Sequence, residues 1–264
     1  MKFGILVINL DCSPERLART AAQLNALNLA WERLPAVDGR SAGASFAADA
    51  YSPELNRHQF KRTLSLGEIG CFLSHRRAWQ RILDAGWDGA IILEDDVILS
   101  KEFSEIPAIL AATAGHWEAV KLWTKRQNYL LFNKIKPADN PRWHLADYFE
   151  IPSGTVAQAI TATAAAKLLA TTSAFGVPVD TALQRYWKTG VSFKALLPLA
   201  VSLSPEFNSD IVTVGGNRGD LQKYPRRRFA PFLYKCGYNA SACYHAIRKH
   251  GTATVLKTCL RMEV

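Results

Sequence analysis

The sequence predicts an α/β protein with a mainly parallel central sheet, and three observations support this. Residues 3–37 show the pattern strand, helix, strand. A long amphipathic helix then runs directly into the apolar residues 90–93. Apolar runs and helical patterns continue to alternate in the second half of the chain. Such alternation is typical of folds in which helices cover a parallel sheet.

The chain opens with a β-α-β unit. Residues 3–8, Phe-Gly-Ile-Leu-Val-Ile, predict a buried strand. Ser13-Pro14 can cap and begin the next helix, which apolar residues at helical spacing carry to about Leu27. Residues 31–37 predict the second strand, which ends at Asp38-Gly39-Arg40.

The middle of the chain predicts a loop and then the longest helix of the first half. Residues 41–63 are polar and weakly periodic, so we expect a loop with one short helix. Ser65 and Glu68 have the S-x-x-E spacing of a capping box, and an apolar stripe follows to about Gly86. The strand at 90–93 comes next.

The second half predicts further elements on the same criteria. They are a helix over 103–114, a strand over 119–123, a loop over 136–152, a strand over 156–160, a helix over 164–171 capped by Thr163, and a turn over 176–180 into another helix.

Charge divides the chain into two parts. Between Arg218 and Val264, ten Lys and Arg residues stand against Asp220 and Glu263, so this stretch carries +8 of the chain's formal +9. We therefore expect a core domain over 1–214 and a basic, helical C-terminal segment over 215–264, with the boundary near Gly215. The asymmetry suggests an acidic partner for this segment.

The basic segment mixes cations with aromatic residues, as in Tyr224-Pro225-Arg226-Arg227-Arg228-Phe229. Proteins that lie on anionic membrane surfaces use this mixture, because Lys and Arg meet lipid phosphates while aromatic rings sit at headgroup depth. Nucleic-acid binding uses the same residue types. The composition of the segment therefore fits a membrane surface or a nucleic acid, and an ordinary solvated helix would also account for the charges.

Several classes of protein are disfavoured by what the sequence lacks. No run of 18 apolar residues is present to span a membrane, and the apolar N-terminal run is too short for a signal peptide. The five cysteines show no C-x-x-C spacing and predict neither a disulfide framework nor a zinc cluster, which fits a reducing cytoplasm. The P-loop, G-x-G-x-x-G, G-x-S-x-G and H-E-x-x-H motifs are also absent.

Three consecutive acids, Glu94, Asp95 and Asp96, directly follow the apolar strand 90–93. Ligands of a doubly wound sheet bind beyond the carboxyl ends of its strands. If the extended conformation continues, Glu94 and Asp96 point to one side and Asp95 to the other. Two carboxylates on one side suit Mg²⁺ or Mn²⁺. A solvated acidic turn is the simpler alternative.

Six short motifs add a resemblance to a known family. They are Asn9-Leu10-Asp11-x-Ser13-x-x-Arg16, Asp38-Gly39-Arg40, Leu66-Gly67-Glu68-Ile69-Gly70-Cys71-x-Leu73-Ser74-His75, Leu93-Glu94-Asp95-Asp96-Val97, Gly154-Thr155 and Pro178-Val179-Asp180. In order and approximate spacing they resemble glycosyltransferase family 25, the bacterial lipooligosaccharide galactosyltransferases, over about residues 3–211. The resemblance implies a GT-A-type, Rossmann-like fold, a UDP-sugar donor, typically UDP-galactose, a divalent metal and inversion at the anomeric carbon.

The resemblance also implies roles for individual residues. The acid triplet is similar to the D-x-D motif of such enzymes, with Asp96 the first metal ligand and Glu94 or Asp95 bound to ribose or to the metal through water. Residues expected to hold the nucleotide sugar are Asn9, Asp11, Arg16, Asp38, Gly39, Arg40, Ser74, His75, Gly154 and Thr155. Helix capping, a glycine turn or a buried structural histidine are alternatives for several of them.

Inversion needs a general base, and a carboxylate is the usual choice. Asp180 is the candidate, with helix N-capping as its alternative. A third metal ligand could come from Asp210 or a histidine. The resemblance further implies a lipid-linked oligosaccharide acceptor and a location in the cytoplasm, peripheral on the inner face of the bacterial inner membrane. We therefore expect residues 218–264 to contact an anionic membrane surface, and we expect no nucleic acid as a partner. Another hexose donor, or a non-catalytic basic module that binds membrane or nucleic acid, are the remaining alternatives.

Overall fold

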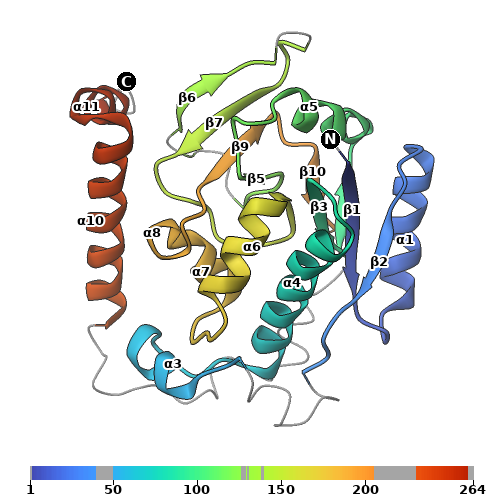
Figure 1. Ribbon diagram of the computed structural model, residues 1–264, viewed down its shortest axis with the longest axis horizontal. Helices are drawn as coiled ribbons and strands as arrows, with labels where there is room; N and C mark the ends of the chain where they lie inside the picture. Colours follow the sequence, from blue (N-terminus) through green and yellow to red (C-terminus); the bar gives the residue numbers. More distant parts are fainter. Residues whose placement is uncertain are drawn as a thin grey trace.

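The computed structural model describes residues 2–39, 50–125, 129, 131–137, 140–204 and 230–260. A large sheet forms the centre, with helices on both faces (Figure 1). The strands are β1 (Phe3–Asn9), β2 (Glu32–Pro35), β3 (Gly89–Glu94), β4 (Val97–Leu99), β5 (Ala119–Lys121), β6 (Leu131–Ile135), β7 (His144–Tyr148), β8 (Ala157–Thr161), β9 (Phe193–Leu197) and β10 (Val201–Leu203). The helices are α1 (Pro14–Ala26), α3 (Pro53–Gln59), α4 (Leu66–Asp84), the 3₁₀ helix η1 (Lys101–Glu105), α5 (Ile106–Ala112), α6 (Ala162–Thr171), α7 (Val179–Gln184), α8 (Tyr186–Thr189), α10 (Ala230–His250) and α11 (Thr252–Leu260).

The central sheet has the strand order β2-β1-β3-β8-β5-β9-β7-β6, and β4 pairs separately with β10. Strand β1 lies parallel to both β2 and β3, and β5 lies parallel to β9. Strands β8 and β7 run the other way, so their pairings are antiparallel. Within the described part of the chain, six of the eight strands of this sheet therefore share one direction, and the fold is mixed α/β.

The side chains of β1 alternate between two apolar clusters, as the period of a strand requires. Leu6 and Ile8 pack on the face covered by α4, α6 and α7, where Phe72 and Trp79 of α4 are fully buried. Ile5 and Val7 pack on the face covered by α1 and α5. The sheet is therefore packed on both faces at β1, and helices lie on both of its sides (Figure 1).

The helix signals of the sequence fall close to the observed boundaries. Helix α4 begins with the predicted capping box, in which Ser65 Oγ accepts from Glu68 N–H and the Glu68 carboxylate accepts from Ser65 N–H. The short helix expected within 41–63 is α3. One cap was misplaced: Thr161, not Thr163, caps α6, because its hydroxyl accepts from Ala164 N–H at the end of β8.

Two strands occupy a region where the sequence indicated a loop or no element. β7 lies inside the predicted loop 136–152, and β6 precedes it. They pair with each other, and β7 pairs with β9 to extend the far edge of the sheet. Polar residues such as Asp147 obscured the strand pattern; Asp147 is buried against Lys194 of β9, with Nζ 2.8 Å from its carboxylate. Residues near Asp147 in the sequence do not reveal this contact, because Lys194 lies on a neighbouring strand 47 residues later in the chain.

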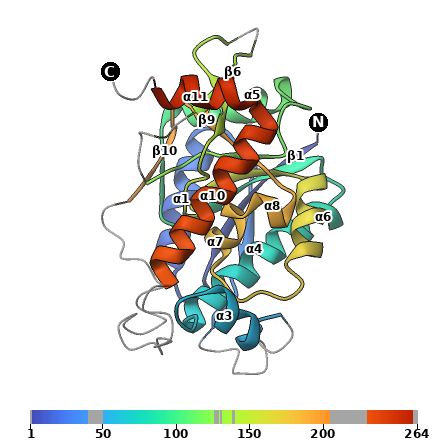
Figure 2. The same cartoon turned by 90° about the vertical axis from the view of Figure 1, so that its left-hand side faces the viewer.

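The predicted C-terminal helices are present as α10 and α11, and α10 runs along one side of the molecule (Figure 2). Lys249 Nζ lies 3.1 Å from the Asp147 carboxylate, and the His250 ring stacks on Phe132. The predicted boundary and the Arg226-Arg227-Arg228 run lie outside the described residues, as does Asp210. Among the helices that the structure describes, none is both long enough and apolar enough to cross a bilayer.

Candidate active site

The sequence motifs meet at one edge of the sheet because of the strand directions. β1, β2 and β3 are parallel, so Asn9, Pro35 and Glu94 end at the same edge. β8 is antiparallel to β3, with Ala157 beside Leu93, and so it begins at this edge. The loop containing Gly154 and Thr155 therefore joins the acid triplet from a strand of opposite direction.

Two neighbouring cavities open at this edge. The first is lined by Arg16, Asp38, Gly39, Ser74, His75 and the acid triplet, among others. The second is lined by Arg62, Glu68, Trp123, Gly154, Thr155 and Asp180, among others. Cys71, Glu94 and Asp96 line both cavities. The cavities thus meet at the acids and at one turn of α4.

The wall of the first cavity depends on a close approach between the loop after β2 and α4. Ser74 Oγ accepts from Val37 N–H at 2.8 Å and donates to Gly70 O at 2.7 Å. A Cβ at Gly70 would lie 2.5 Å from Val37 O, and one at Gly39 would lie 2.3 Å from Leu66 O. Glycine at both positions lets the two backbones touch, so Ser74 holds the wall in place.

Asp95 points toward α1 and is held by three groups. Its carboxylate accepts from Asn9 Nδ2 at 2.7 Å and lies 3.3 Å from Arg16 Nη1, and its backbone carbonyl accepts from Thr20 Oγ1. The predicted residues Asn9 and Arg16 therefore contact the acid triplet. Arg16 also lines the first cavity, whereas Asn9 is buried behind it.

Two of the predicted nucleotide-binding residues are not seen at the cavities: Asp11 lies apart from them, and Arg40 is outside the described residues. Asp11 is largely exposed, pairs with Arg33 and is not among the residues that line either cavity. Arg40 lies outside the described residues, so its placement stays a prediction.

Glu94 faces α4 and the loop before β8. Its Oε1 accepts from Thr155 Oγ1 at 2.7 Å and lies 3.4 Å from His75 Nε2. Burial alone would raise the pKa of Glu94, but His75, Thr155 and Lys121 outweigh it and hold the pKa below its usual value. His75 is buried, and its Nδ1 lies 3.3 Å from Gln158 Nε2.

Asp96 differs from its neighbours because a buried oxygen, Oδ1, has no hydrogen-bond partner among the residues that the structure describes. Burial, together with the charges of Glu94 and Asp95, raises the pKa of Asp96 to about 7. A carboxylate placed where its negative charge is disfavoured is a group that a bound cation would stabilise.

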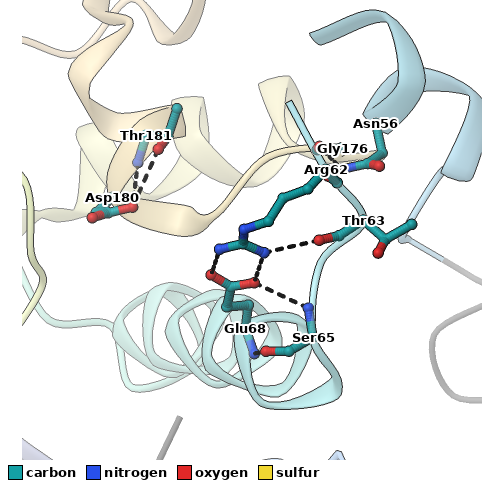
Figure 3. Close-up of polar contacts among 8 residues, drawn as sticks. All are labelled: Asn56, Arg62, Thr63, Ser65, Glu68, Gly176, Asp180 and Thr181. Atoms are coloured by element: carbon teal, nitrogen blue, oxygen red, sulfur yellow. Dashed lines mark hydrogen bonds and ion pairs between the residues drawn. The ribbon is translucent and has the colours of Figure 1, made fainter. Parts of the chain in front are cut away.

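Asp180 lies beside Thr181 in the first turn of α7 (Figure 3). Pro178 occupies the N-cap position of this helix. Asp180 Oδ1 accepts from Thr181 N–H at 2.7 Å, and its Oδ2 accepts from Gly154 N–H at 3.2 Å. The expected alternative, simple N-capping by Asp180, is therefore not what the structure shows. The carboxylate instead joins α7 to the 154–155 loop.

A bidentate ion pair stands at another part of the second cavity (Figure 3). Arg62 Nη1 and Nη2 donate to the two oxygens of Glu68 at 2.8 and 2.7 Å. Glu68 is therefore a capping residue, as its spacing from Ser65 indicated. It also fixes the position of Arg62.

Sequence reasoning missed Lys121 and Cys71. Lys121, at the end of β5, is fully buried, and its Nζ donates to Gly154 O. Burial lowers the pKa of Lys121 to about 8, although Asp180 and Glu94 favour its charged form. In the sequence, the feature that could have pointed to Lys121 is that it is the one charged residue in the apolar run 119–123.

Cys71 precedes His75 by one helical turn, and this i, i+4 spacing was its signal. Burial raises the pKa of the Cys71 thiol well above its usual value, and the charges of Glu94 and Asp180 add to the effect. The expectation that the cysteines form no metal cluster rested on spacing between cysteines. The structure brings one of them beside a histidine and a glutamate.

Part of the chain is similar in sequence to known proteins. The chain is 32% identical over 128 residues to a glycosyltransferase 25 family member of Aedes aegypti, covering 46% of this chain and 21% of that protein. It is 33% identical over 102 residues to a probable inactive glycosyltransferase 25 family member 3 of Rattus norvegicus, covering 38% and 18%. The matched part is thus about a fifth of each relative's length.

Solved structures resemble the chain only weakly. A197 from STIV covers 79% of this chain and 97% of its own at 10% identity, with a TM-score of 0.38. The mannose-1-phosphate geranyltransferase of Thermus thermophilus covers 74% of both chains at 13% identity, also with a TM-score of 0.38. Neither similarity carries an argument about this chain.

A family model decides the assignment. The model described as glycosyltransferase family 25 (LPS biosynthesis protein) matches residues 3–183, which include the acid triplet, α4, the 154–155 loop and Asp180. This is more than half of the chain, and so the protein belongs to glycosyltransferase family 25.

Proposed function

We propose that this protein is an inverting, metal-dependent hexosyltransferase of GT-A type that transfers galactose from UDP-galactose to a sugar of a lipooligosaccharide or lipopolysaccharide acceptor. The observation that carries the proposal is the environment of the Asp96 carboxylate. Its buried Oδ1, which has no hydrogen-bond partner among the described residues, lies beside Glu94 where two cavities meet. One cavity suits a donor and the other an acceptor.

The residues at this point fit a hard divalent cation. Carboxylate oxygens are the ligands that Mg²⁺ and Mn²⁺ prefer, and Asp96 and Glu94 supply them from one strand end. Asp95 is bound to Asn9 and Arg16, so we assign it to positioning the triplet. The bound cation would neutralise charge that develops on the departing diphosphate.

The first cavity is the proposed donor site. Arg16 and Asp38 line it together with the backbone at Gly39. A nucleotide needs paired donors and acceptors for its base and ribose, and guanidinium matches phosphate oxygens. Ser74 supports this site by holding its wall, and His75 by orienting Glu94.

The second cavity is the proposed acceptor site, with Asp180 as the general base. As the acceptor oxygen bonds to the anomeric carbon, its proton passes to the Asp180 carboxylate and the bond to UDP breaks. The N–H groups of Gly154 and Thr181 orient this carboxylate, and the buried Lys121 holds the Gly154 carbonyl. Trp123 lines the same cavity and offers an aromatic surface to a sugar ring.

Binding of UDP tests the proposal directly. We expect UDP to bind the purified chain at least about tenfold more tightly with Mn²⁺ than with chelator, a difference of ~1.4 kcal/mol. Asp96→Asn should remove this increment, because the amide cannot supply the anionic oxygen. Calorimetric titration measures both. Equal binding with and without metal would reject the enzyme proposal.

Transfer assays then separate the remaining alternatives. UDP-galactose and UDP-glucose tested against defined lipooligosaccharide fragments identify the donor hexose. Metal-dependent UDP binding without transfer of any hexose would instead point to a non-catalytic family member, in line with the relatives named inactive. Asp180→Asn should abolish transfer while UDP binding persists, since Asp180 acts on the acceptor.

A further inference from the structure

Cys71, His75 and Glu94 bring three different ligand atoms together. Cys71 and His75 lie four residues apart on α4 and so share a helix face, and Glu94 is the last residue of β3. The thiol sulfur, an imidazole nitrogen and a carboxylate oxygen all lie within 4.8 Å of one another. Within the described part of the chain, this group has the composition of a metal site for a softer cation than Mg²⁺.

The distance between His75 and Glu94 fits two ligands of one metal ion. His75 Nε2 and Glu94 Oε1 are 3.4 Å apart, longer than a good charge-assisted hydrogen bond of about 2.7–2.9 Å. Tetrahedral zinc with nitrogen and oxygen bonds of about 2.0–2.1 Å separates such ligands by about 3.3 Å. The pair is therefore spaced for coordination with little rearrangement.

The surroundings of the group supply the contacts that metal ligands require. A histidine that binds zinc through one nitrogen donates its other N–H to a nearby acceptor. Gln158 is fully buried, its Nε2 lies 3.3 Å from His75 Nδ1, and its Oε1 has no hydrogen-bond partner within the described part of the chain. Turning this amide, whose oxygen and nitrogen have nearly the same shape, gives Nδ1–H an acceptor. Thr155 meanwhile donates to Glu94.

We propose that Cys71, His75 and Glu94 form a binding site for a thiophilic divalent cation, zinc by the class of its ligands, separate from the Asp96 position but sharing Glu94 with it. Thiolate and carboxylate together balance the charge of the cation, and the thiol proton is released to solvent on binding. Cys71 and Glu94 line both cavities, so a fourth ligand position can face water or a phosphate oxygen.

The shared carboxylate gives this site a consequence, which rests on the proposed function. A zinc ion on Cys71, His75 and Glu94 withdraws Glu94 from the hard-metal position at Asp96. Zinc should therefore weaken Mn²⁺-dependent UDP binding. In this way a softer cation would regulate the enzyme at its own active site.

Cobalt is the probe for the site itself. Co²⁺ titrated into the metal-free full chain, without nucleotide, should give one equivalent of a near-ultraviolet sulfur-to-cobalt charge-transfer band that Zn²⁺ abolishes. Cys71→Ser should remove the band, while Cys12→Ser, which alters an exposed cysteine that lines neither cavity, should keep it. His75→Gln should weaken Co²⁺ binding at least about tenfold.

The result that overturns the proposal is the absence of the band in the parent chain, or its survival in Cys71→Ser. X-ray absorption of the zinc-loaded parent needs no substitution and should find one sulfur among nitrogen and oxygen neighbours; a shell without sulfur also rejects the site. Neither measurement contains nucleotide. A negative cobalt or X-ray absorption result therefore does not affect the metal-dependent UDP test, and a negative UDP test does not affect the Cys71–His75–Glu94 site. The regulatory consequence is checked by UDP titration in Mn²⁺ with added Zn²⁺, each variant compared with its own zinc-free value.

Discussion

Asp95 and Asp96 are chemically identical neighbours with opposite environments. Asp95 is enclosed by Asn9 and Arg16, which stabilise its charge. Asp96 has a buried oxygen to which no described residue hydrogen-bonds, and its pKa is raised to about 7. One residue therefore contributes to the stability of the strand end, and the other stores an unfavourable charge that a ligand can relieve.

The first prediction at the residue scale concerns Asp96 in chelator. Its folded-state pKa of about 7 lies above the ordinary 3.8, so its stabilising protonated form is lost as the pH rises from about 4 through 7. Asp96→Asn mimics the protonated form. We expect it to be more stable than the parent at pH 8, on the order of 2–4 kcal/mol, with little difference near pH 4. Urea unfolding at both pH values measures this.

Asp95→Asn is the matched control, since it makes the same chemical change one residue earlier. It removes the carboxylate charge from a buried pair with Arg16 and should destabilise the chain at pH 8 by about 3 kcal/mol. Equal effects of the two substitutions would contradict the distinction between them.

At the scale of elements, the site depends on one reversed strand. β8 runs against β3, and this direction brings Gly154 and Thr155 to the edge where β1 and β3 end. The sequence predicted the strand and the motif but not the direction, because direction is set by pairing with β3 and β5. The same holds for β6 and β7, whose pairing was invisible in a polar segment.

Gly154 provides the prediction for this loop. Its φ is +89°, and a Cβ there would lie 2.7 Å from the Trp123 ring. Gly154→Ala should therefore cost about 1–3 kcal/mol from backbone strain, with the clash in addition, and should reduce transfer because the loop holds Thr155 and Asp180. Thermal unfolding and transfer assays measure the two effects.

Gly115→Ala separates strain from contact. Gly115 has a similar φ of +84°, but in the part of the chain that the structure describes no atom outside its immediate neighbourhood lies within 4 Å of a Cβ at that position. It should show the strain alone and leave transfer unchanged. If both variants lose the same stability and keep full transfer, Trp123 does not restrict the loop.

At the scale of the whole molecule, α10 links the basic C-terminal part to the body. Lys249 meets Asp147, and His245 stacks on Trp187 of α8. Deleting the segment would therefore also remove packing from the sheet edge. Membrane contact, which stays a proposal, is better tested by changing charges than by truncation.

We predict that replacing Arg226, Arg227 and Arg228 with Gln weakens binding to vesicles of anionic lipid. Each basic residue near such a surface contributes about 1 kcal/mol, so the loss should be on the order of 100-fold. Vesicle sedimentation measures it. The control replaces Lys101, Lys134 and Lys136, three exposed lysines outside the segment, and should bind as the parent does. Equal binding of all three proteins would reject the membrane contact.

The sequence by itself determined the α/β class, the capping box of α4, the strand that ends at Glu94 and, through its motifs, the family. These features are local, because periodicity and capping depend on residues close together in the chain. Tertiary structure alone decided that Asp95 is enclosed while Asp96 is not, that Lys121 lies beneath Gly154, and that Cys71 meets Glu94. Each of these depends on which strands pair and in which direction, and that is settled by long-range packing rather than by neighbouring residues.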